Sequence, residues 1–407
     1  MKIEKAHLYV EKYSKLHQEL LLDFILENEF IYFQNNGDYL ERMHLEKGQY
    51  EPTMLLLHGC APARKLREGA VLTVDMDKLL TLRSALRNSA HDTAFQRSYP
   101  ATVYLEVDDG AGFAQLIDDP ESTVSNRIHR RWMGDIPPTW SDSPCALENM
   151  RDDFELCVWN VGQGNTNSIA DPFHLTLFDF GASIYNTKAQ LERILQDHAP
   201  LFANKTSISM ILSHWDCDHF NLLCAVDNSF LEHICCIFYP PGVMSLTARQ
   251  IAERIKLCCK YRVQIAPAPR RARNRCGIHA VYEGERYTLF TGENSSNRNH
   301  SGLLLALYSK TQTALLTADH SNYQVWDRMY AAVRTWGQRT HIVVPHHGGD
   351  CGRLTIPNVT QPGVAAVSVG SNNYHHPRPA TLNEYRHAGY HVIRTDRCGS
   401  DVTIPMN

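Results

Sequence analysis

The 407-residue sequence has no long hydrophobic run, no paired-cysteine motif and no marked excess of charge. No stretch approaches the roughly eighteen consecutive apolar residues of a membrane span, so no membrane partner is expected. The N-terminal Met-Lys-Ile-Glu-Lys-Ala-His carries acid as well as base and leads into no apolar segment, so a signal peptide is not expected. The net charge of −4 gives no overall attraction to nucleic acid, and such binding would require a local basic patch.

The twelve cysteines are scattered and form no Cys-x-x-Cys pair. This spacing argues against a zinc ribbon and a disulfide framework, and is typical of reduced thiols in a cytoplasmic protein. We therefore expect a cytoplasmic location. Hydrophobic content of 43% and charged content of 21% are ordinary for a globular protein, and the length leaves room for two or three domains.

A cluster of turn-forming residues at 134–153 predicts a domain boundary. Residues 1–150 predict a small α+β domain, beginning with an amphipathic helix over 5–28. This domain carries no catalytic constellation and is a candidate surface for a protein partner.

Residues 151–407 alternate short apolar strands with amphipathic helices. Helices are predicted at 187–197, 247–260, 322–336 and 380–388. Strands are predicted at 154–161, 174–180, 207–213, 234–239, 262–266, 286–291, 302–308, 313–318, 341–345, 364–369 and 391–395. This alternation predicts an α/β fold in which two sheets lie between helices.

The strongest chemical signal follows the apolar run 208–212. Four potential metal ligands occur within six residues, namely His214, Asp216, Asp218 and His219. Alternate side chains of an extended strand point the same way, so the first three can converge, and the fourth joins them if the chain turns. Imidazole with carboxylate suits zinc, manganese or iron. A solvated acidic turn is the alternative, but so many unpaired ionisable groups beside a buried strand would be costly.

Similar groups end three later apolar segments. Asp319 follows one, His346 and His347 follow the next, and His375 with His376 follow the last. A single histidine is more often structural than functional. Because four strand ends in one domain carry acid or imidazole, we expect them to meet at one rim and to form a dinuclear metal site.

These motifs resemble a known family. NVGQGN, DFG, SHWDCDH, LLTAD, VPHHG, SVGSNNYHHP and RTDRCG occur in the order found in the soluble hydrolase domain of ComEC competence proteins, a branch of the metallo-β-lactamase superfamily. The resemblance covers about residues 154–407. It implies an αββα metallo-β-lactamase sandwich and a metal-dependent hydrolase, with a phosphodiester of DNA or RNA as the expected substrate and two divalent ions, zinc or manganese, as cofactors.

The resemblance also implies roles for particular residues. His214 and Asp216 would bind one metal ion, and Asp218 and His219 the other. Asp319 would bridge the two ions.

Motifs later in the sequence supply the other metal ligands and the catalytic residues that the resemblance implies. His346 would finish the second site, with His347 as the alternative. Asn299 or His300 stands where the superfamily has its third histidine, and the sequence leaves the choice open. The residues expected to take part in catalysis are Asp218, His347 and His376.

Departures from the family pattern leave two alternatives open. Asn160 and Asn165 stand where the family usually has aspartate, and Ala318 where it has glycine. These differences allow a hydrolase of a small ester, lactone or phosphorylated metabolite. They also allow a metal-binding regulatory protein that has lost catalysis.

A basic stretch lies at 249–275, where nine lysines and arginines accompany one acid, Glu253. Two prolines predict a loop after the 247–260 helix. The stretch is either a solvated helix face with a loop or a surface that tracks phosphates. In the second case the expected substrate-binding residues are Arg270, Arg271, Arg273 and Asn373.

Overall fold

The computed structural model describes residues 5–14, 19–26, 54–58, 71–75, 102–106, 146–186, 188–241, 246–271, 275–295, 297–333, 338–372 and 374–407. Two of the predicted substrate-binding residues, Arg273 and Asn373, lie outside these ranges. The chain divides into two compact units. The first comprises Met1–Asp135, Tyr185–Arg193 and Gly242–Leu257, and the second comprises Ile136–Ile184, Ile194–Pro241 and Cys258–Asn407. The domain limits 1–150 and 151–407 stay a prediction from composition.

The first unit contains a five-stranded sheet with the order β4-β1-β2-β3-β5. Its strands are β1 (Lys5–Ser14), β2 (Glu19–Leu26), β3 (Met54–His58), β4 (Val71–Asp75) and β5 (Thr102–Glu106).

The helix predicted over 5–28 is wrong, because β1 and β2 form an antiparallel pair there. Leu8 and Val10 are buried on β1, and Leu20 and Leu22 on β2. These apolar residues fit both helical spacing and alternation. Pairing with β4 on one side and β3 on the other resolves the ambiguity in favour of strands.

The second unit contains two seven-stranded mixed sheets. The first has the order β11-β10-β9-β8-β7-β6-β19. Its strands are β6 (Phe154–Val158), β7 (Thr166–Ala170), β8 (His174–Phe180), β9 (Ser207–Ile211), β10 (Ile234–Tyr239), β11 (Tyr261–Gln264) and β19 (Val402–Met406). The second has the order β12-β13-β14-β15-β16-β17-β18. Its strands are β12 (Ile278–Glu283), β13 (Tyr287–Gly292), β14 (Leu303–Tyr308), β15 (Gln312–Leu316), β16 (Arg339–Val343), β17 (Gln361–Val367) and β18 (His391–Arg394).

The helical segments of the described chain are short. They are η1 (Ala146–Glu148), α6 (Lys188–Phe202), α7 (Cys217–Phe220), η2 (Asn221–Cys224), α8 (Asn228–Glu232), α9 (Leu246–Cys258), η3 (Arg298–His300), η4 (Tyr323–Met329), α10 (Tyr330–Ala332), η5 (Pro345–Gly348), α11 (Pro379–His387) and α12 (Thr395–Cys398). Among the described residues, no helix is long and apolar enough to cross a membrane.

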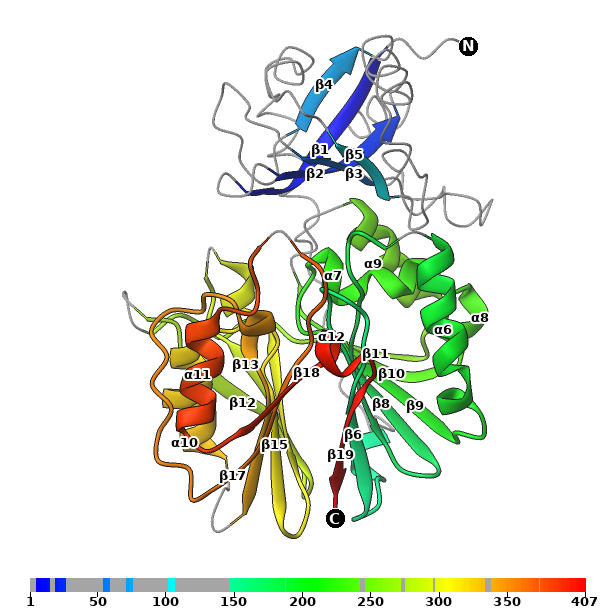
Figure 1. Cartoon of the computed structure of the whole chain (residues 1–407). Coiled ribbons are helices and arrows are strands. Elements are labelled where there is room, and N and C mark those ends of the chain that lie inside the picture. The colour runs from blue at the N-terminus through cyan, green and yellow to red at the C-terminus, as the bar shows by residue number, and fades with distance from the viewer. Residues whose placement is uncertain are drawn as a thin grey trace. The chain divides into compact units, whose positions relative to one another are not determined.

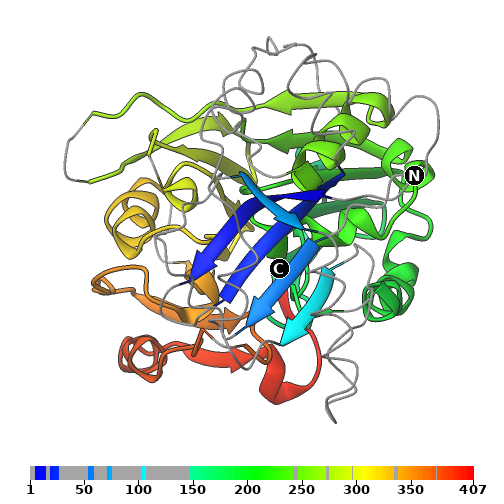
Figure 2. The same ribbon diagram turned by 90° about the horizontal axis from the view of Figure 1, so that it is seen from above.

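The two sheets of the second unit pack face to face, with helices on their outer sides (Figures 1 and 2). Leu303 and Leu305 of β14 point inward and join a core with residues of the other sheet, including Leu156 and Ile211. Leu304, between them in sequence, faces outward, into a second cluster with residues of η4 and α11. This alternation buries both faces of the strand, and the architecture is the αββα sandwich that the sequence predicts.

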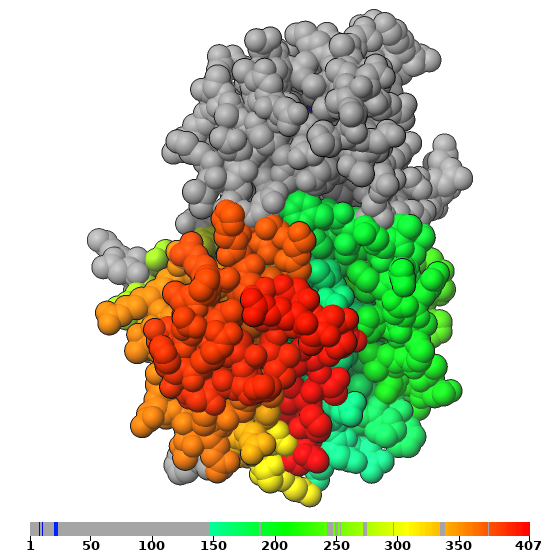
Figure 3. Space-filling model, in the orientation of Figure 1, coloured from blue at the N-terminus to red at the C-terminus, as the bar shows by residue number. Residues whose placement is uncertain are grey.

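Each predicted strand of this unit has a counterpart, but three observed strands were missed. β7 is largely polar, β12 is a half-exposed edge strand, and β19 contains Pro405. Proline fits an edge strand, where one side of the backbone needs no partner. β19 closes the first sheet beside β6, and Figure 3 shows the C-terminal residues in red where the two halves of the sandwich meet.

Candidate metal centre

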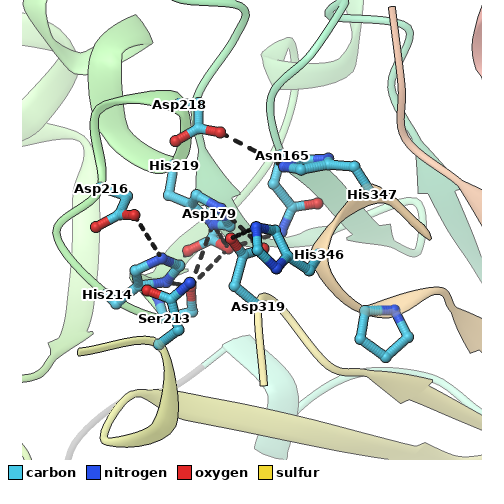
Figure 4. A network of polar contacts seen from close by, with 12 residues as sticks. Asn165, Asp179, Ser213, His214, Asp216, Asp218, His219, Asp319, His346 and His347 are labelled. Carbon is cyan, nitrogen blue, oxygen red and sulfur yellow. Dashed lines mark hydrogen bonds and ion pairs between the residues drawn. The ribbon is translucent and has the colours of Figure 1, made fainter. Parts of the chain in front are cut away.

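The candidate ligands gather at the carboxyl ends of parallel strands (Figure 4). Asp179 ends β8, and the segment 213–219 follows β9 and enters α7. Asp319 follows β15, and His346 and His347 follow β16. Because β8 and β9 are parallel, and β15 and β16 are parallel, these side chains lie at one edge of each sheet. Packing of the two sheets brings the edges together.

Asp179, on the first sheet of the second unit, accepts hydrogen bonds from several residues of the site. It is fully buried. Its Oδ1 accepts a hydrogen bond from the backbone N–H of Ser213 at 2.6 Å. Its Oδ2 accepts from Ser213 Oγ at 2.8 Å, Asn165 Nδ2 at 2.7 Å and His219 Nδ1 at 2.8 Å. A carboxylate only accepts, so His219 must carry its proton on Nδ1 and present the Nε2 lone pair to the site.

The same reasoning fixes two more imidazoles. The Ser213 hydroxyl has one proton, which it donates to Asp179, so it accepts from His214 Nδ1 at 2.9 Å. His347 Nδ1 donates to the Ser368 carbonyl at 2.8 Å. All three histidines therefore present Nε2 as a potential ligand, held in orientation by a hydrogen bond at the opposite nitrogen, as is usual for metal-binding histidine.

These three nitrogens fit a metal ion better than they fit hydrogen bonds. Within the described chain, Nε2 of His214, of His219 and of His347 is buried and makes no hydrogen bond. Carboxylate oxygens lie 3.3 Å from His219 (Asp319), 3.5 Å from His347 (Asp218) and 3.7 Å from His214 (Asp216). Ligands about 2.0–2.1 Å from a tetrahedral ion are separated by roughly 3.3 Å, so these gaps are of the size that an ion would fill.

Two triads bring ligand atoms within 4.8 Å of one another. One is His214, His219 and Asp319, and the other is Asp218, His219 and His347. The second triad contains His347, the alternative to His346. His346 Nε2 lies 3.6 Å from Asp319 Oδ2 and belongs to neither triad.

Asp216 is likewise in neither triad. Its Oδ1 is paired with Nε of Arg298, in the run 297–300 where the sequence resemblance would place the third histidine of the superfamily. Asp216, Asp218 and His214 do not converge by strand alternation, because β9 ends at Ile211 and Asp218 lies in the first turn of α7.

Opposite charges within the site shift one another's pKa values. Burial by itself would lower the pKa of His219, but the carboxylates of Asp319 and Asp179 outweigh it and hold that pKa well above its usual value. Burial would raise the pKa of Asp319, but His346 and His219 hold it well below the usual range. The pKa of His347 is raised as well, because Asp218 and Asp319 outweigh its burial. A metal ion would take the place of the protons that these carboxylates favour.

Asn165 has a structural role at its position. Its side-chain amide donates to Asp179, and its backbone N–H donates to the Asp218 carbonyl at 2.9 Å. An aspartate there would place a second carboxylate against Asp179. The departure from the family pattern is therefore compatible with an intact metal site.

The backbone of this rim is conformationally unusual. Six described non-glycine residues have positive φ. Five of them follow or end strands at the rim, namely Asp179, Ala318, His346, His347 and His375. Such conformations are uncommon for residues with a side chain and recur at functional sites.

A cavity of about 850 Å³ opens beside the candidate ligands and is lined by Asp319 and His346. Its wall includes the exposed guanidinium groups of Arg270 and Arg275, together with Arg353. The pKa of His300, another lining residue, is lowered by burial and by the positive charges of Arg270 and His346. The cavity therefore combines Asp319, a candidate metal ligand, with three arginines, and the carboxylates of Asp327 and Asp350 also line it.

The other predicted residues lie around this cavity or outside it. Arg271 is exposed and is not part of the lining. His376 Nδ1 lies 3.5 Å from Gln163 Nε2, and its ring lies 5.1 Å from that of His346. It belongs to neither triad.

The sequence analysis missed the residues that orient the ligands. Asp179 lies in DFG, a motif that is weak on its own, and Ser213 gave no signal beyond its place in SHWDCDH. Arg298 looked like one of many loop arginines. The one available signal was an aspartate at the end of the apolar strand that precedes the metal motif in sequence, because consecutive strands often lie side by side and their ends then meet.

Comparisons with known structures find proteins of the superfamily that the motifs resemble. The metallo-beta-lactamase fold protein YhfI from Bacillus subtilis is 13% identical over 63% of this chain and 100% of its own, with a TM-score of 0.35. Tm1679, described as a metal-dependent hydrolase of the beta-lactamase superfamily, is 9% identical over 62% of this chain and 98% of its own, with a TM-score of 0.37. A variant of CmlA beta-hydroxylase is 12% identical over 89% of this chain and 71% of its own, with a TM-score of 0.35.

No protein-family model and no curated protein matches the sequence. The fold assignment rests on the strand order and sheet packing described above.

Proposed function

We propose that the protein is a metal-dependent phosphodiesterase that cleaves nucleic acid, similar in its chemistry to the hydrolase domain of ComEC proteins. The observation that carries the proposal is the cavity in which Asp319 and His346 face a wall containing Arg270, Arg275 and Arg353. Guanidinium groups match phosphate in geometry and charge, and Asp319, a member of one candidate triad, lines the same cavity.

The triads would hold zinc or manganese, since mixed imidazole and carboxylate ligands suit both ions. A bound ion would act as a Lewis acid on a phosphoryl oxygen and lower the pKa of a water molecule. Asp179 and Ser368 keep the ligand nitrogens aimed at the site. The arginines would bind and orient the phosphate.

We assign His376 the role of proton donor to the leaving oxygen. It lies near His346 at the edge of the site and outside both triads. His376→Ala should keep the metal content and lower kcat by about 10²–10⁴. The loss should be smaller on a nitrophenyl ester, whose leaving group needs little protonation. Loss of metal in this variant would show that His376 is a ligand instead.

The cavity volume also favours a second candidate function, the hydrolysis of a small phosphorylated molecule. About 850 Å³ lies within the usual range of small-molecule pockets, roughly 300–1,000 Å³. A small substrate needs only the arginines inside the cavity, whereas a polymer needs the exposed basic residues outside it as well.

A substrate panel with salt titration separates the two functions. Purified protein with added Zn²⁺ or Mn²⁺ is assayed on single-stranded DNA, duplex DNA, RNA and bis-p-nitrophenyl phosphate. Polymer binding should weaken with salt by a slope of about 0.7 per phosphate contact on single strands. Arg271→Glu, outside the cavity, should reduce that slope and leave the small diester unaffected. Arg339→Glu, at the opposite end of β16, is the charge-matched control and should change neither.

The proposal of a nucleic-acid substrate fails if the slope is the same in both variants while the small diester is cleaved. The whole proposal fails if no phosphodiester is hydrolysed with either metal.

A further inference from the structure

Glu293 is a buried carboxylate that directly follows β13 and has no part in the mechanism above. Its Oε2 accepts a hydrogen bond from the backbone N–H of Gly277 at 3.0 Å, and its Oε1 accepts from His279 Nε2 at 3.1 Å. The backbone N–H of Arg271 donates to the same carboxylate. Burial by itself would raise the pKa of Glu293, but these donors outweigh burial and lower it, so the group is ionised at neutral pH.

Backbone hydrogen bonds join the residues around Glu293 to two described parts of the chain that precede β12. The N–H of Glu293 donates to the Gly277 carbonyl at 3.0 Å. The N–H of Asn294 donates to the Ala268 carbonyl at 2.8 Å, and the Ala268 N–H donates to the Gly292 carbonyl at 2.9 Å. Both parts are therefore fixed at the end of β13, and the Glu293 carboxylate lies between them.

These two parts, 268–271 and 275–277, carry arginines of the cavity wall. Arg270 and Arg275 line the cavity, whereas Glu293 is not among the lining residues. The Arg275 guanidinium lies over the Tyr323 ring, 4.8 Å from its centroid. Both arginines are exposed, so the path of the backbone is what brings their side chains to the cavity. Glu293 binds that backbone next to each arginine.

We propose that Glu293 is a positioning residue, whose carboxylate holds the backbone so that Arg270 and Arg275 reach the cavity and bind the phosphate of the substrate. This inference rests on the proposed phosphodiesterase function. It predicts an effect opposite in sign to the simple electrostatic one. Removal of a negative charge near a phosphate site by itself strengthens anion binding, whereas loss of the bonds that position the arginines weakens it.

Anion binding by the metal-free protein tests the inference without turnover. The full-length protein is treated with a chelator, dialysed and titrated with inorganic pyrophosphate in a calorimeter. Glu293→Ala should weaken pyrophosphate binding by roughly 10–100-fold, as should Arg275→Gln, which removes a cavity arginine directly. Glu293→Gln keeps an oxygen acceptor for the Gly277 N–H and should bind within about threefold of the unaltered protein.

Asp171→Ala is the matched control. Asp171 is also a buried carboxylate that accepts from backbone N–H groups and from a histidine ring, but it precedes β8, whereas Asp179 ends that strand at the rim. This variant should lose stability and bind pyrophosphate normally. Gly277→Ala tests the contact from the other side, because a Cβ there would meet Glu293 Oε1 at 2.9 Å, and it should weaken binding. If Glu293→Ala does not fold, as judged by circular dichroism, Gly277→Ala decides the question.

Turnover gives a second measurement. On bis-p-nitrophenyl phosphate with Zn²⁺ or Mn²⁺, Glu293→Ala should raise KM by roughly 10–100-fold and keep kcat within about threefold, because the arginines bind the phosphate in the ground state and the transition state alike.

Several outcomes would overturn the role given to Glu293. These are an unaltered protein that does not bind pyrophosphate, a folded Glu293→Ala protein that binds it as tightly or more tightly, a Glu293→Gln protein as weak as Glu293→Ala, and an equal loss of binding in Asp171→Ala. Absence of turnover with either metal would instead refute the phosphodiesterase proposal, and the pyrophosphate titrations would still decide whether Glu293 positions the arginines.

Discussion

Replacing Asp179 by asparagine tests whether a residue that touches no metal controls metal affinity. Among the described residues, Asp179 Oδ1 accepts a hydrogen bond from the Ser213 N–H alone, so the new carbonyl oxygen should remain there. The new amide NH₂ then replaces Oδ2, where three groups now donate. His219 can adapt only by moving its proton to Nε2, which removes the lone pair that faces the site.

The size of the effect follows from these contacts. Loss of such an orienting partner typically lowers metal affinity by about 10–100-fold, which corresponds to about 1.4–2.7 kcal/mol. Asn165 Nδ2 loses its acceptor, which costs about a further 1–3 kcal/mol of folding stability but not of metal binding. Metal affinity is measured by competition with a chromophoric chelator, and stability by chemical denaturation of the metal-free protein.

Asp171→Asn is the matched control. Asp171 is also buried, and it accepts from the backbone N–H groups of Arg151, Phe173 and His174 and from the His174 ring. It precedes β8, whereas Asp179 lies at the other end of that strand. This variant should lose stability and keep metal affinity. If Asp179→Asn binds metal as tightly as the unaltered protein, the tautomer argument is wrong.

Three further predictions concern other parts of the second unit. Gly181→Ala should destabilise the protein by about 1–3 kcal/mol and weaken metal binding, because a Cβ there would overlap the Asp218 carbonyl oxygen and meet His219 Cα at 2.5 Å. Gly399→Ala is the control, since Gly399 has a positive φ but a Cβ there would meet no atom within 4 Å, and it should leave metal binding unchanged. Metal at about 100 times its Kd should stabilise the fold by about 2.7 kcal/mol, and a thermal midpoint that ignores both metal and chelator would contradict the site. The third concerns His198, which pairs with Asp401 at 3.0 Å. Burial lowers the pKa of His198, but Asp401 and the Ile194 carbonyl outweigh burial, so the pKa is raised. Burial raises the pKa of Asp401, but His198 and the Asn160 N–H outweigh burial, so that pKa is lowered. The contribution of His198 to the free energy of unfolding is therefore full below its unfolded pKa of about 6.5 and is lost as pH rises through the raised pKa. The contribution of Asp401 is full above its unfolded pKa of about 3.9 and is lost as pH falls through the lowered pKa. His198→Gln should accordingly cost about 0.5–1 kcal/mol more near pH 5.5 than near pH 9, and a cost independent of pH in denaturation curves would exclude this pair as a source of stability.

The strand pattern of the second unit was predictable because its strands are short, apolar and separated by turn residues. Leu303–Tyr308 is an example, since both faces of this strand are buried and the apolar run is nearly continuous. β1 and β2 were not predictable in the same way. Their leucines satisfy two periodicities, and only the pairing of distant strands decides between them.

The candidate ligands and the residues around them also differ in how far the sequence predicts them. His214, Asp218 and His219 stand out because they lie within six residues of one another just after a buried strand. Arg298 and Asp216 are far apart in sequence, and no local pattern predicts that they pair. The contact exists because η3 and the segment after β9 are brought together by the packing of two sheets, which is a property of the whole fold.

The positive-φ residues at the rim have a consequence for how the protein would respond to selection. Each such conformation costs a residue with a side chain about 1–2 kcal/mol, and glycine would relieve most of it. A library screened only for heat resistance should therefore accumulate glycine or asparagine at Ala318, His346 and His347, of which His347 belongs to a candidate triad. Selection for thermal stability would therefore substitute residues in or next to the candidate metal site.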